Sequence, residues 1–289
     1  MTGAVLDTSA PRIGLALGAG GAHGIAHVLA LEALDELGLR PAAITGASIG
    51  ALIGAGVAAG MSGLAIREHV MTLLSDRRAF LGHLWELRPR SLSELMAAGG
   101  LPQVDPERAV GLALPAAVPE RFEELAIPLT ILGTDFYGWQ EVRLASGLLK
   151  PAIAASIAIP GVFRPQVIDG RVLVDGGIAN PLPFDALPDG LDITIAIDVV
   201  GGPEEPDDAA RVPQPIPAIL GSSQILMQSA IALRLRIGAP TLLVRPPISR
   251  FGELDFWRAP EILSACALFK DEFKISVDLV VNTSLSGPR

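Results

Sequence analysis

Cationic side chains and cysteine are both scarce in this chain. Its 22 lysine and arginine residues are outnumbered by 31 acidic residues, which gives a net charge of −9 and a pI near 5.0. Nucleic acids are bound by basic surfaces, so this balance argues against a nucleic-acid partner. The single cysteine, Cys266, excludes a disulfide within the chain and is typical of a reducing compartment. Because the chain does not begin with a positively charged leader, we expect no cleaved signal peptide and a cytoplasmic location.

Charged residues are absent from one long stretch, residues 41–66. Its length would allow a membrane span, but it begins with proline and consists mostly of alanine and glycine, which insert poorly into a bilayer. We therefore predict a strand, a tight turn and a buried helix instead. No group of histidine and acidic residues has the spacing of metal ligands, so we expect neither a metal nor another cofactor.

Residues 46–50 have the pattern Gly-x-Ser-x-Gly, with Ser48 at the centre. Apolar residues precede this stretch and helix-compatible residues follow it. A serine between two glycines at a strand-to-helix turn can hold a strained backbone while its hydroxyl projects at the end of a sheet. The pattern predicts a nucleophile elbow, in which Gly46 and Gly50 leave room for neighbouring backbone.

A histidine base for Ser48 is not available in the expected order. In α/β-hydrolases the serine is followed by an acid and then by a histidine, but no histidine follows His83 here. His69 and His83 come soon after Ser48, in a stretch that is predicted to be helical. We therefore expect a carboxylate to act as the base.

Asp175 is the carboxylate in the most suitable setting. Residues 171–174 form a β-prone run after the turn at 169–170, so Asp175 is predicted at the end of a hairpin strand, with Gly176 and Gly177 allowing a tight exit. A plain turn is the commoner meaning of such a sequence. Four other aspartates also lie near predicted strand ends and compete for the role: Asp135, Asp169, Asp185 and Asp198.

A glycine-rich stretch, residues 18–24, follows an apolar run and opens a predicted helix. Its unpaired N–H groups and the helix dipole favour an anion, which could be a nucleotide phosphate or the oxyanion formed when a serine attacks an ester. The spacing differs from Gly-x-Gly-x-x-Gly, no acid ends the second predicted strand, and every lysine lies at position 150 or later. These departures favour the oxyanion.

Together the three motifs resemble those of the patatin-like phospholipases, in particular the compact bacterial members related to neuropathy target esterase. The glycine-rich loop, the Gly-x-Ser-x-Gly and the Asp-Gly-Gly occur here in the family's order, and the resemblance covers about residues 11–270. It is strengthened by further matching stretches at 155–163, 168–170, 180–181 and 255–259.

The resemblance implies a serine lipid acyl hydrolase with a dyad of Ser48 as nucleophile and Asp175 as base. It also implies an oxyanion hole formed by N–H groups at Ala19, Gly20 and Gly21. Supporting positions would be His23, Gly46, Gly50, Gly176 and Gly177.

The glycine-rich loop departs from the family pattern at two positions. Ala19 stands where glycine is frequent, and it preserves the backbone donor. His23 stands where arginine or lysine is common, and histidine titrates near neutrality. His23 is therefore expected either to make the activity depend on pH or to have a structural role only.

Short apolar runs alternate with amphipathic stretches along the chain. Strands are predicted at 12–17, 42–46, 128–134, 141–145, 172–175, 192–199 and 241–245. Helices are predicted at 24–37, 49–59, 63–75, 92–98, 106–113, 148–157, 218–236 and 259–281. This succession predicts an α/β fold with a mainly parallel central sheet, in a single three-layer α/β/α domain that covers residues 1–289. The proline-rich residues 201–217 are predicted to form a mobile surface loop.

Residues 76–114 place apolar and aromatic side chains beside several arginines. Such a segment could contact a membrane surface or cover an acyl-chain groove, although a helix that packs on the core is the simpler interpretation. The expected function is hydrolysis of carboxylic esters of phospholipids or lysophospholipids. The partner would be a lipid ester, with peripheral contact at the inner membrane face as an option. The alternative is a non-catalytic lipid- or protein-binding module that keeps the same fold.

Overall fold

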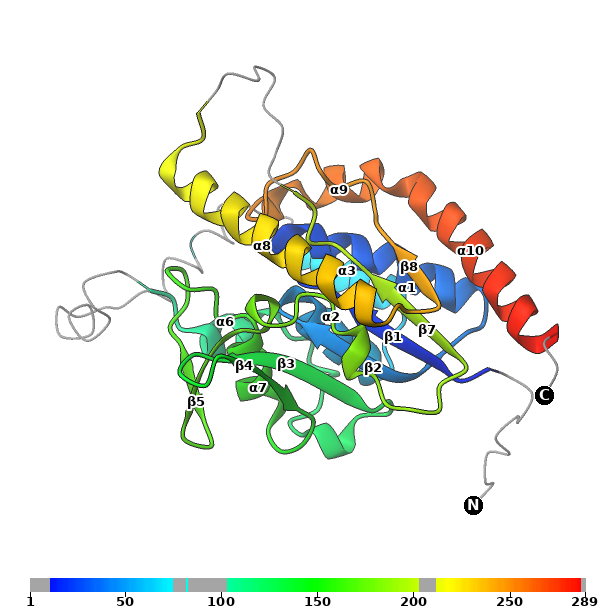
Figure 1. The fold of residues 1–289 in the computed structure, drawn as a ribbon, viewed down its shortest axis with the longest axis horizontal. Coiled ribbons are helices and arrows are strands. Elements are labelled where there is room, and N and C mark those ends of the chain that lie inside the picture. Colours follow the sequence, from blue (N-terminus) through cyan, green and yellow to red (C-terminus); the bar gives the residue numbers. More distant parts are fainter. Residues whose placement is uncertain (1–10, 75–81, 83–102, 203–211, 287–289) are drawn as a thin grey trace.

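A computed structural model describes residues 11–74, 82, 103–202 and 212–286 of the chain. Within these residues, eight strands form one sheet in the order β5-β6-β3-β2-β1-β7-β8, with β4 paired to β3 (Figure 1). The strands that run parallel to one another are β1 (Ile13–Leu17), β2 (Pro41–Ala47), β3 (Leu129–Asp135), β7 (Ile193–Ile197) and β8 (Leu242–Val244). The antiparallel part consists of β4 (Gln140–Leu144), β5 (Gln166–Ile168) and β6 (Arg171–Asp175).

Strand β3 has two different neighbours along one of its edges. Its residue Leu132 pairs with Ala47 of β2 and with β4, whereas Gly133 pairs with Asp175 of β6 and with β4. Because a strand has only two edges, β2 and β6 must lie on the same edge of β3, one after the other. The chain that leaves β2 after Ala47 therefore meets the end of β6 at Asp175.

One face of the sheet carries most of the helices and the larger core. Ile13, Leu15 and Leu17 of β1 point into this core, because side chains alternate along a strand. The helices that contribute to it are α1 (His27–Glu36), α2 (Ile49–Ala58), α3 (Gly63–Leu74), α6 (Pro106–Ala113), α7 (Leu149–Ser156), α9 (Ala259–Ala265) and α10 (Ala267–Ser286).

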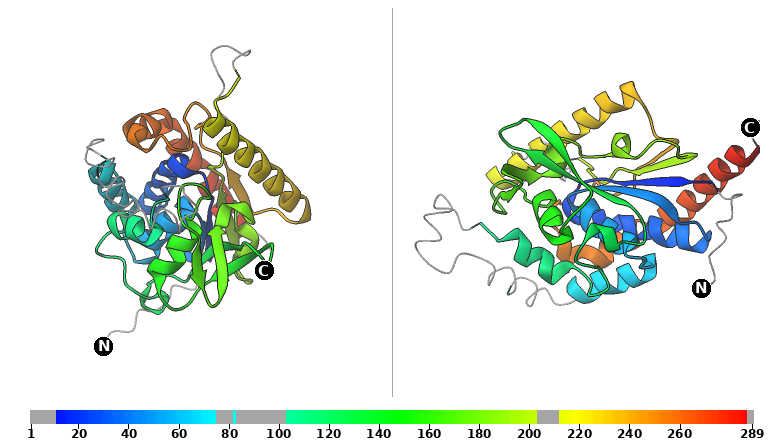
Figure 2. Two further views of the ribbon diagram at one scale, coloured as in Figure 1. Left: turned by 90° about the vertical axis from the view of Figure 1, so that its left-hand side faces the viewer. Right: turned by 90° about the horizontal axis from the view of Figure 1, so that it is seen from below.

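The opposite face is covered mainly by one helix, α8 (Pro215–Ile237), as the right-hand view of Figure 2 shows. A smaller core lies beneath it and includes Ala16 of β1, Leu132 of β3, and Met227 and Ile231 of α8. The sheet thus lies between two layers, and the expected α/β fold with a mainly parallel sheet is confirmed.

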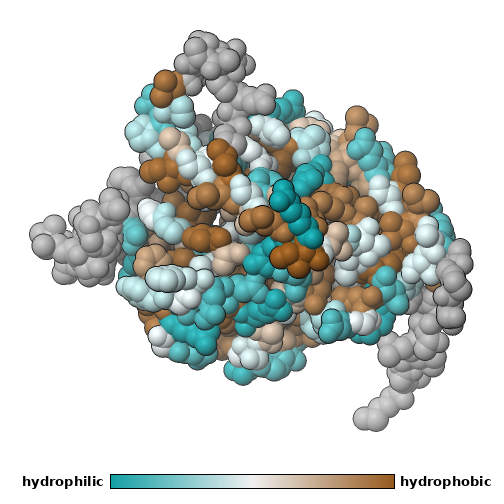
Figure 3. Space-filling view, in the orientation of Figure 1, coloured by the Kyte–Doolittle hydropathy of each residue, from teal (hydrophilic) through white to brown (hydrophobic). Residues whose placement is uncertain are grey.

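Helix α8 is apolar on its outer side as well. Brown, hydrophobic residues follow its course across the molecule in Figure 3. Among the described helices, it is the one whose length and composition would suffice to cross a membrane, over Pro217–Ile237. Only 22% of an apolar 18-residue stretch of this helix is buried in the protein.

Most of the predicted elements are present with boundaries within a few residues, and the differences have local causes. The predicted helix 259–281 is two helices, because Cys266 leaves the helical conformation at φ −94° and ψ 11°. The predicted loop 201–217 ends earlier, since α8 already begins at Pro215. A proline fits the first turn of a helix, where its missing N–H is not needed. Strand β5 was not predicted.

Two expectations fall largely on other parts of the chain. The predicted helix 92–98 and most of the cover segment 76–114 lie outside the described residues, as do residues 203–211 of the predicted loop. Within the cover segment, α6 forms as predicted. Asp105 caps its N-terminus by accepting hydrogen bonds from the N–H groups of Glu107 and Arg108. The single-domain organisation stays a prediction.

Candidate active site

Ser48 lies in the turn between β2 and α2 with a strained backbone, at φ 53° and ψ −121°. The flanking glycines are required by close contacts. A Cβ on Gly46 would lie 2.5 Å from the carbonyl oxygen of Gly50, and a Cβ on Gly50 would lie 2.2 Å from that of Leu17. The local geometry is therefore that of the predicted elbow, and the Ser48 N–H is fixed by donating to Ser156 Oγ at 2.9 Å.

The Ser48 hydroxyl donates a hydrogen bond to Asp175 Oδ2 at 2.6 Å, and both residues are buried. The other carboxylate oxygen of Asp175 accepts from the Gly177 N–H at 2.7 Å. Burial raises the pKa of Asp175 to about 6, while the hydrogen bonds from Ser48 and Gly177 act in the opposite direction. The carboxyl group is thus oriented on the serine and has a proton affinity suited to a base near neutral pH.

The four competing aspartates lie in other settings in the structure. Asp135 accepts from N–H groups of its own turn, and Asp169 has a left-handed conformation at the β5–β6 turn. Asp185 pairs with Arg234, and Asp198 with Arg245. Of these five aspartates, the structure brings only Asp175 to Ser48.

The glycine-rich loop leaves β1 beside Ser48, and its N–H groups differ in availability. The Ala19 N–H donates to the carbonyl oxygen of Pro181 at 2.8 Å, so Ala19 cannot serve as the oxyanion donor expected from the sequence. The N–H groups of Gly20 and Gly21 have no partner within the described part of the chain. Gly20 is the N-cap and Gly21 the first residue of the 3₁₀-helix Gly21–Ala26, which leads into α1, and N–H groups at the start of a helix favour an anion. The candidate oxyanion hole is reduced to these two donors.

Both glycines of the candidate oxyanion hole are required by their surroundings. A Cβ on Gly20 would lie 2.0 Å from the carbonyl oxygen of Val199. Gly21 has a left-handed φ of 56°, and its Cβ would lie 2.3 Å from the carbonyl oxygen of Glu253. The loop therefore sits too close to two neighbouring segments to accept a side chain at either position.

His23 of this loop and His27, the first residue of α1, are fully buried and contact backbone carbonyl oxygens. His23 Nε2 lies 2.6 Å from the carbonyl oxygen of Phe251, and Nδ1 lies 3.3 Å from that of Val200. This position favours the structural alternative for His23, because its ring joins two loops and does not reach solvent. Burial lowers the pKa of His27 to about 4. Its neutral ring holds the carbonyl oxygen of Gly18 at 3.0 Å from Nε2.

Glu253 is a neighbour of the site that the sequence did not indicate. Its carbonyl oxygen accepts from the Ala22 N–H at 2.8 Å, and its side chain lies over Gly21. Burial, and then the charge of Asp175, raise the pKa of Glu253 to about 7. Its position after Phe251, far along the chain from Ser48, carries no motif that could have identified it.

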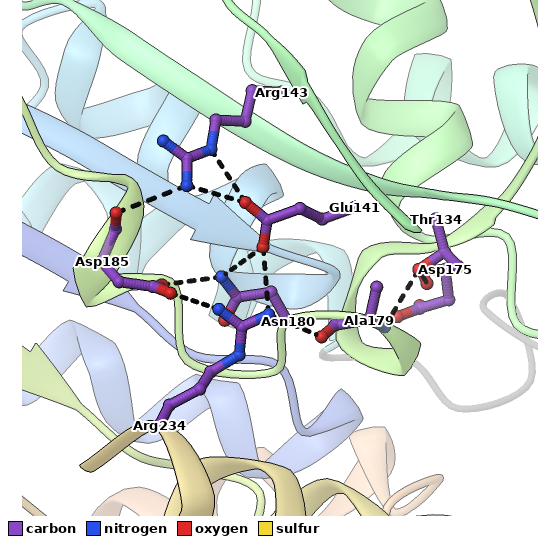
Figure 4. A network of polar contacts seen from close by, with 8 residues as sticks. All are labelled: Thr134, Glu141, Arg143, Asp175, Ala179, Asn180, Asp185 and Arg234. Carbon is purple, nitrogen blue, oxygen red and sulfur yellow. Dashed lines mark hydrogen bonds and ion pairs between the residues drawn. The ribbon is translucent and has the colours of Figure 1, made fainter. Parts of the chain in front are cut away.

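A polar network joins Asp175 to α8 and β4 (Figure 4). Thr134 Oγ1 donates to the Asp175 carbonyl oxygen at 2.8 Å and accepts from the Ala179 N–H at 3.1 Å. The carbonyl oxygen of Ala179 accepts from Arg234 of α8 at 3.1 Å, and Arg234 also pairs with Glu141 of β4 at 3.1 Å. Asn180 and Asp185 complete the network.

This arrangement can support covalent catalysis by a serine. A hydroxyl is held against a carboxyl group, and the adjacent loop offers two N–H groups that no described residue engages. The described residues contain no group of three histidine, cysteine, aspartate or glutamate side chains that could hold a metal ion.

Comparison with known proteins places residues 15–188 in a match to the family described as patatin-like phospholipase. An uncharacterized NTE family protein of Mycobacterium tuberculosis is 36% identical over 203 residues, 70% of this chain and 53% of that protein. A protein named lysophospholipase from Kluyveromyces lactis is 27% identical over 293 residues, 92% of this chain and 19% of that protein. The chain spans about half the length of the former and about a fifth of the latter.

Among solved structures, human GIVD cytosolic phospholipase A2 in complex with methyl gamma-linolenyl fluorophosphonate is similar, with a TM-score of 0.46 and 13% identity. The match covers 96% of this chain and 60% of that one.

Proposed function

Because this chain belongs to the patatin-like phospholipase family, we propose that it is a serine hydrolase that cleaves carboxylic esters of lipids, as a phospholipase A or lysophospholipase. The observation that carries the proposal is the hydrogen bond of 2.6 Å from the Ser48 hydroxyl to the buried carboxylate of Asp175. The name of the Kluyveromyces lactis relative, lysophospholipase, supports the same class of substrate.

In the proposed acylation step, Asp175 takes the proton of the Ser48 hydroxyl while Oγ attacks the ester carbonyl carbon. The carbonyl oxygen becomes an oxyanion, which the N–H groups of Gly20 and Gly21 stabilise. The intermediate then collapses, the bond to the alcohol breaks, and the proton on Asp175 passes to the leaving oxygen. The products are the released alcohol and an acyl ester on Ser48.

Deacylation repeats these steps with water. Asp175 takes a proton from water, the hydroxide attacks the acyl carbon, and the second oxyanion occupies the same two donors. Its collapse returns the proton from Asp175 to Ser48 Oγ and releases the fatty acid. One carboxylate thus acts alternately as base and acid, and no histidine is needed.

Labelling with a fluorophosphonate tests this proposal. The wild-type protein should take up one label at Ser48, and Ser48→Ala should take up none, because only an activated hydroxyl reacts. Ser222→Ala, which changes an exposed serine of α8, is the matched control and should be labelled like wild type. Release of fatty acid from phosphatidylcholine and lysophosphatidylcholine then defines the substrate. A protein that is folded but neither labelled nor active would instead be a binding module.

A further inference from the structure

Helix α8 has apolar side chains on both its inner and its outer side. Met227 and Ile231 are buried against the sheet, but Ile219, Leu226 and Leu233 are exposed on the outside. A helix that is apolar on all sides is normally buried, and contiguous exposed apolar surface marks a binding site. The outer face of α8 is therefore built to be covered.

Charge is almost excluded from this face. The 23 residues of α8 contain neither an acidic residue nor a lysine, although the whole chain has a net charge of −9. Its two charged residues, Arg234 and Arg236, lie in the last turns. Arg234 is engaged by Glu141 and Asp185, so it belongs to the inner side. A surface that avoids charge suits contact with hydrocarbon.

A second apolar element is the turn between β3 and β4, and β4 is linked to α8 by the ion pair of Glu141 with Arg234. Phe136, Tyr137 and Trp139 are all exposed there, and Trp139 retains 91% of its accessible surface. Tyr137 is the one tyrosine of the chain. Tryptophan and tyrosine are favoured where apolar and aqueous regions meet at a membrane surface. Glu141, close to this turn, ties it to α8 through Arg234.

Both elements adjoin the candidate active site. The aromatic turn follows the carboxyl end of β3, the same edge of the sheet at which β1 and β2 lead to Gly18 and Ser48. The left-hand view of Figure 2 looks onto this edge, with α8 along one side. α8 also reaches the Asp175 loop, since a Cβ on Gly177 would lie 3.3 Å from Met227 Sδ.

We propose that the outer face of α8 and the aromatic turn 136–139 form one docking surface that rests on a lipid bilayer. This surface, the α8 docking surface, holds the edge with Ser48 against the membrane that contains the substrate. The identity of the substrate in this proposal depends on the proposed function, whereas the apolar surface itself does not depend on catalysis. α8 lies on the bilayer and does not span it, because spanning would break its buried contacts and the Arg234 network.

Vesicle sedimentation in a Ser48→Ala background tests docking without hydrolysis. The protein should bind phosphatidylcholine vesicles, and the binding should persist in high salt because the surface carries little charge. The double variant Leu226→Glu with Leu233→Glu should weaken vesicle binding. The expected loss is roughly tenfold or more for each leucine replaced, because the free energy of burying that apolar side chain in the bilayer is lost. Trp139→Ala should weaken it less, and tryptophan emission of the protein should shift to the blue on binding unless Trp139 is replaced.

The matched control is Leu268→Glu with Leu279→Glu on α10, which are similarly exposed and add the same charge. This pair should bind vesicles like the parent protein. Thermal unfolding verifies that each variant is folded. Equal loss of binding in both pairs, or binding that needs anionic lipid and disappears in salt, would overturn the proposal. A dimer in light scattering that only the α8 pair dissociates, without vesicle binding, would assign the surface to a second copy of the chain.

The outcomes also separate docking from catalysis. Vesicle binding without fluorophosphonate labelling of the wild-type protein would leave the α8 docking surface standing and refute the proposed hydrolase. Labelling of Ser48 without vesicle binding would support the proposed hydrolase and refute the α8 docking surface.

Discussion

The two longest described helices, α8 and α10, both expose large apolar side chains, but their surroundings differ. On α10, Leu268, Ile275 and Leu279 alternate with charged residues, and Lys270 and Lys274 form ion pairs with Glu32 and Glu36 of α1. On α8 the outer face has almost no charge, and its ion-paired arginine points toward the Asp175 loop.

This difference indicates that the two helices serve different purposes. Scattered apolar residues among charges are ordinary for a protein surface, so α10 is expected to contribute mainly to stability through α1. α8 contacts the Asp175 loop of the candidate active site and is connected to it by hydrogen bonds. Changes on the α8 side of the sheet should therefore affect activity, and changes on the α10 side should affect stability.

The largest effect is expected at the dyad. Ser48→Ala and Asp175→Asn should each lower kcat by about 10⁴-fold or more, and the double variant should be little worse, because the two residues act as one unit. Release of fatty acid under single-turnover conditions is the measurement. Lys274→Met on α10 is the comparison and should retain full activity. An active Asp175→Asn protein would show that another group is the base.

The next largest effect concerns the oxyanion loop. Gly20→Val should cost about 10²-fold in kcat, because its Cβ would collide with the carbonyl oxygen of Val199 and displace a donor. Gly238→Ala, at the end of α8 where a Cβ meets no atom within 4 Å, should be neutral.

The glycine-rich loop should also bind no nucleotide, and equilibrium dialysis with ATP checks this. Binding that Gly20→Val abolishes would restore the phosphate-loop interpretation.

The pH profile should be bell-shaped because two carboxyl groups near the reaction have raised pKa values. Asp175 must be ionised to act as base, so activity should rise as pH passes about 6. Glu253 ionises near pH 7, and its negative charge beside the oxyanion loop should then oppose the transition state, so activity should fall. Glu253→Gln should remove this alkaline limb and raise kcat/KM up to about tenfold at pH 8.

Glu272→Gln on α10 is the control for this measurement and should leave the profile unchanged. The acid limb should remain in the Glu253→Gln protein, since Asp175 ionises while Glu253 is still neutral. An alkaline limb that survives in this variant would exclude Glu253 as its cause.

The smallest effects should separate α8 from α10 directly. Arg234→Met removes the bonds from α8 to Ala179 and should lower kcat by about fivefold, because small displacements of a positioned group are costly. Lys270→Met removes ion pairs to α1 and should lower the free energy of unfolding by about 1 kcal/mol or less, without loss of activity. Urea unfolding and turnover, measured on both proteins, give the comparison. The reverse pattern would contradict the division between the two helices.

Local features could be recognised in the sequence. The elbow at Ser48 and the glycine-rich loop depend on glycines at fixed short spacings, and most strands depend on short apolar runs. The sequence therefore predicts these features to within a few residues. Errors arose where a local signal has two meanings. Pro215 is one example, because proline is typical of loops but also fits the first turn of a helix, and here it begins α8. The break between α9 and α10 is a different case, because no residue near Cys266 is a helix-breaking signal.

The serine elbow, the glycine-rich loop and the β-hairpin aspartate can each be recognised from a few adjacent residues, because each depends on local turn and strand preferences. How these three features meet depends on the folding of distant segments against one another. Asp175 contacts Ser48 because β2 and β6 follow one another along the same edge of β3, a consequence of strand register that no local pattern encodes. Contacts from distant segments shape the glycine-rich loop in a similar way. The carbonyl oxygen of Pro181 engages the Ala19 N–H, and Glu253 is brought against Gly21 and Ala22.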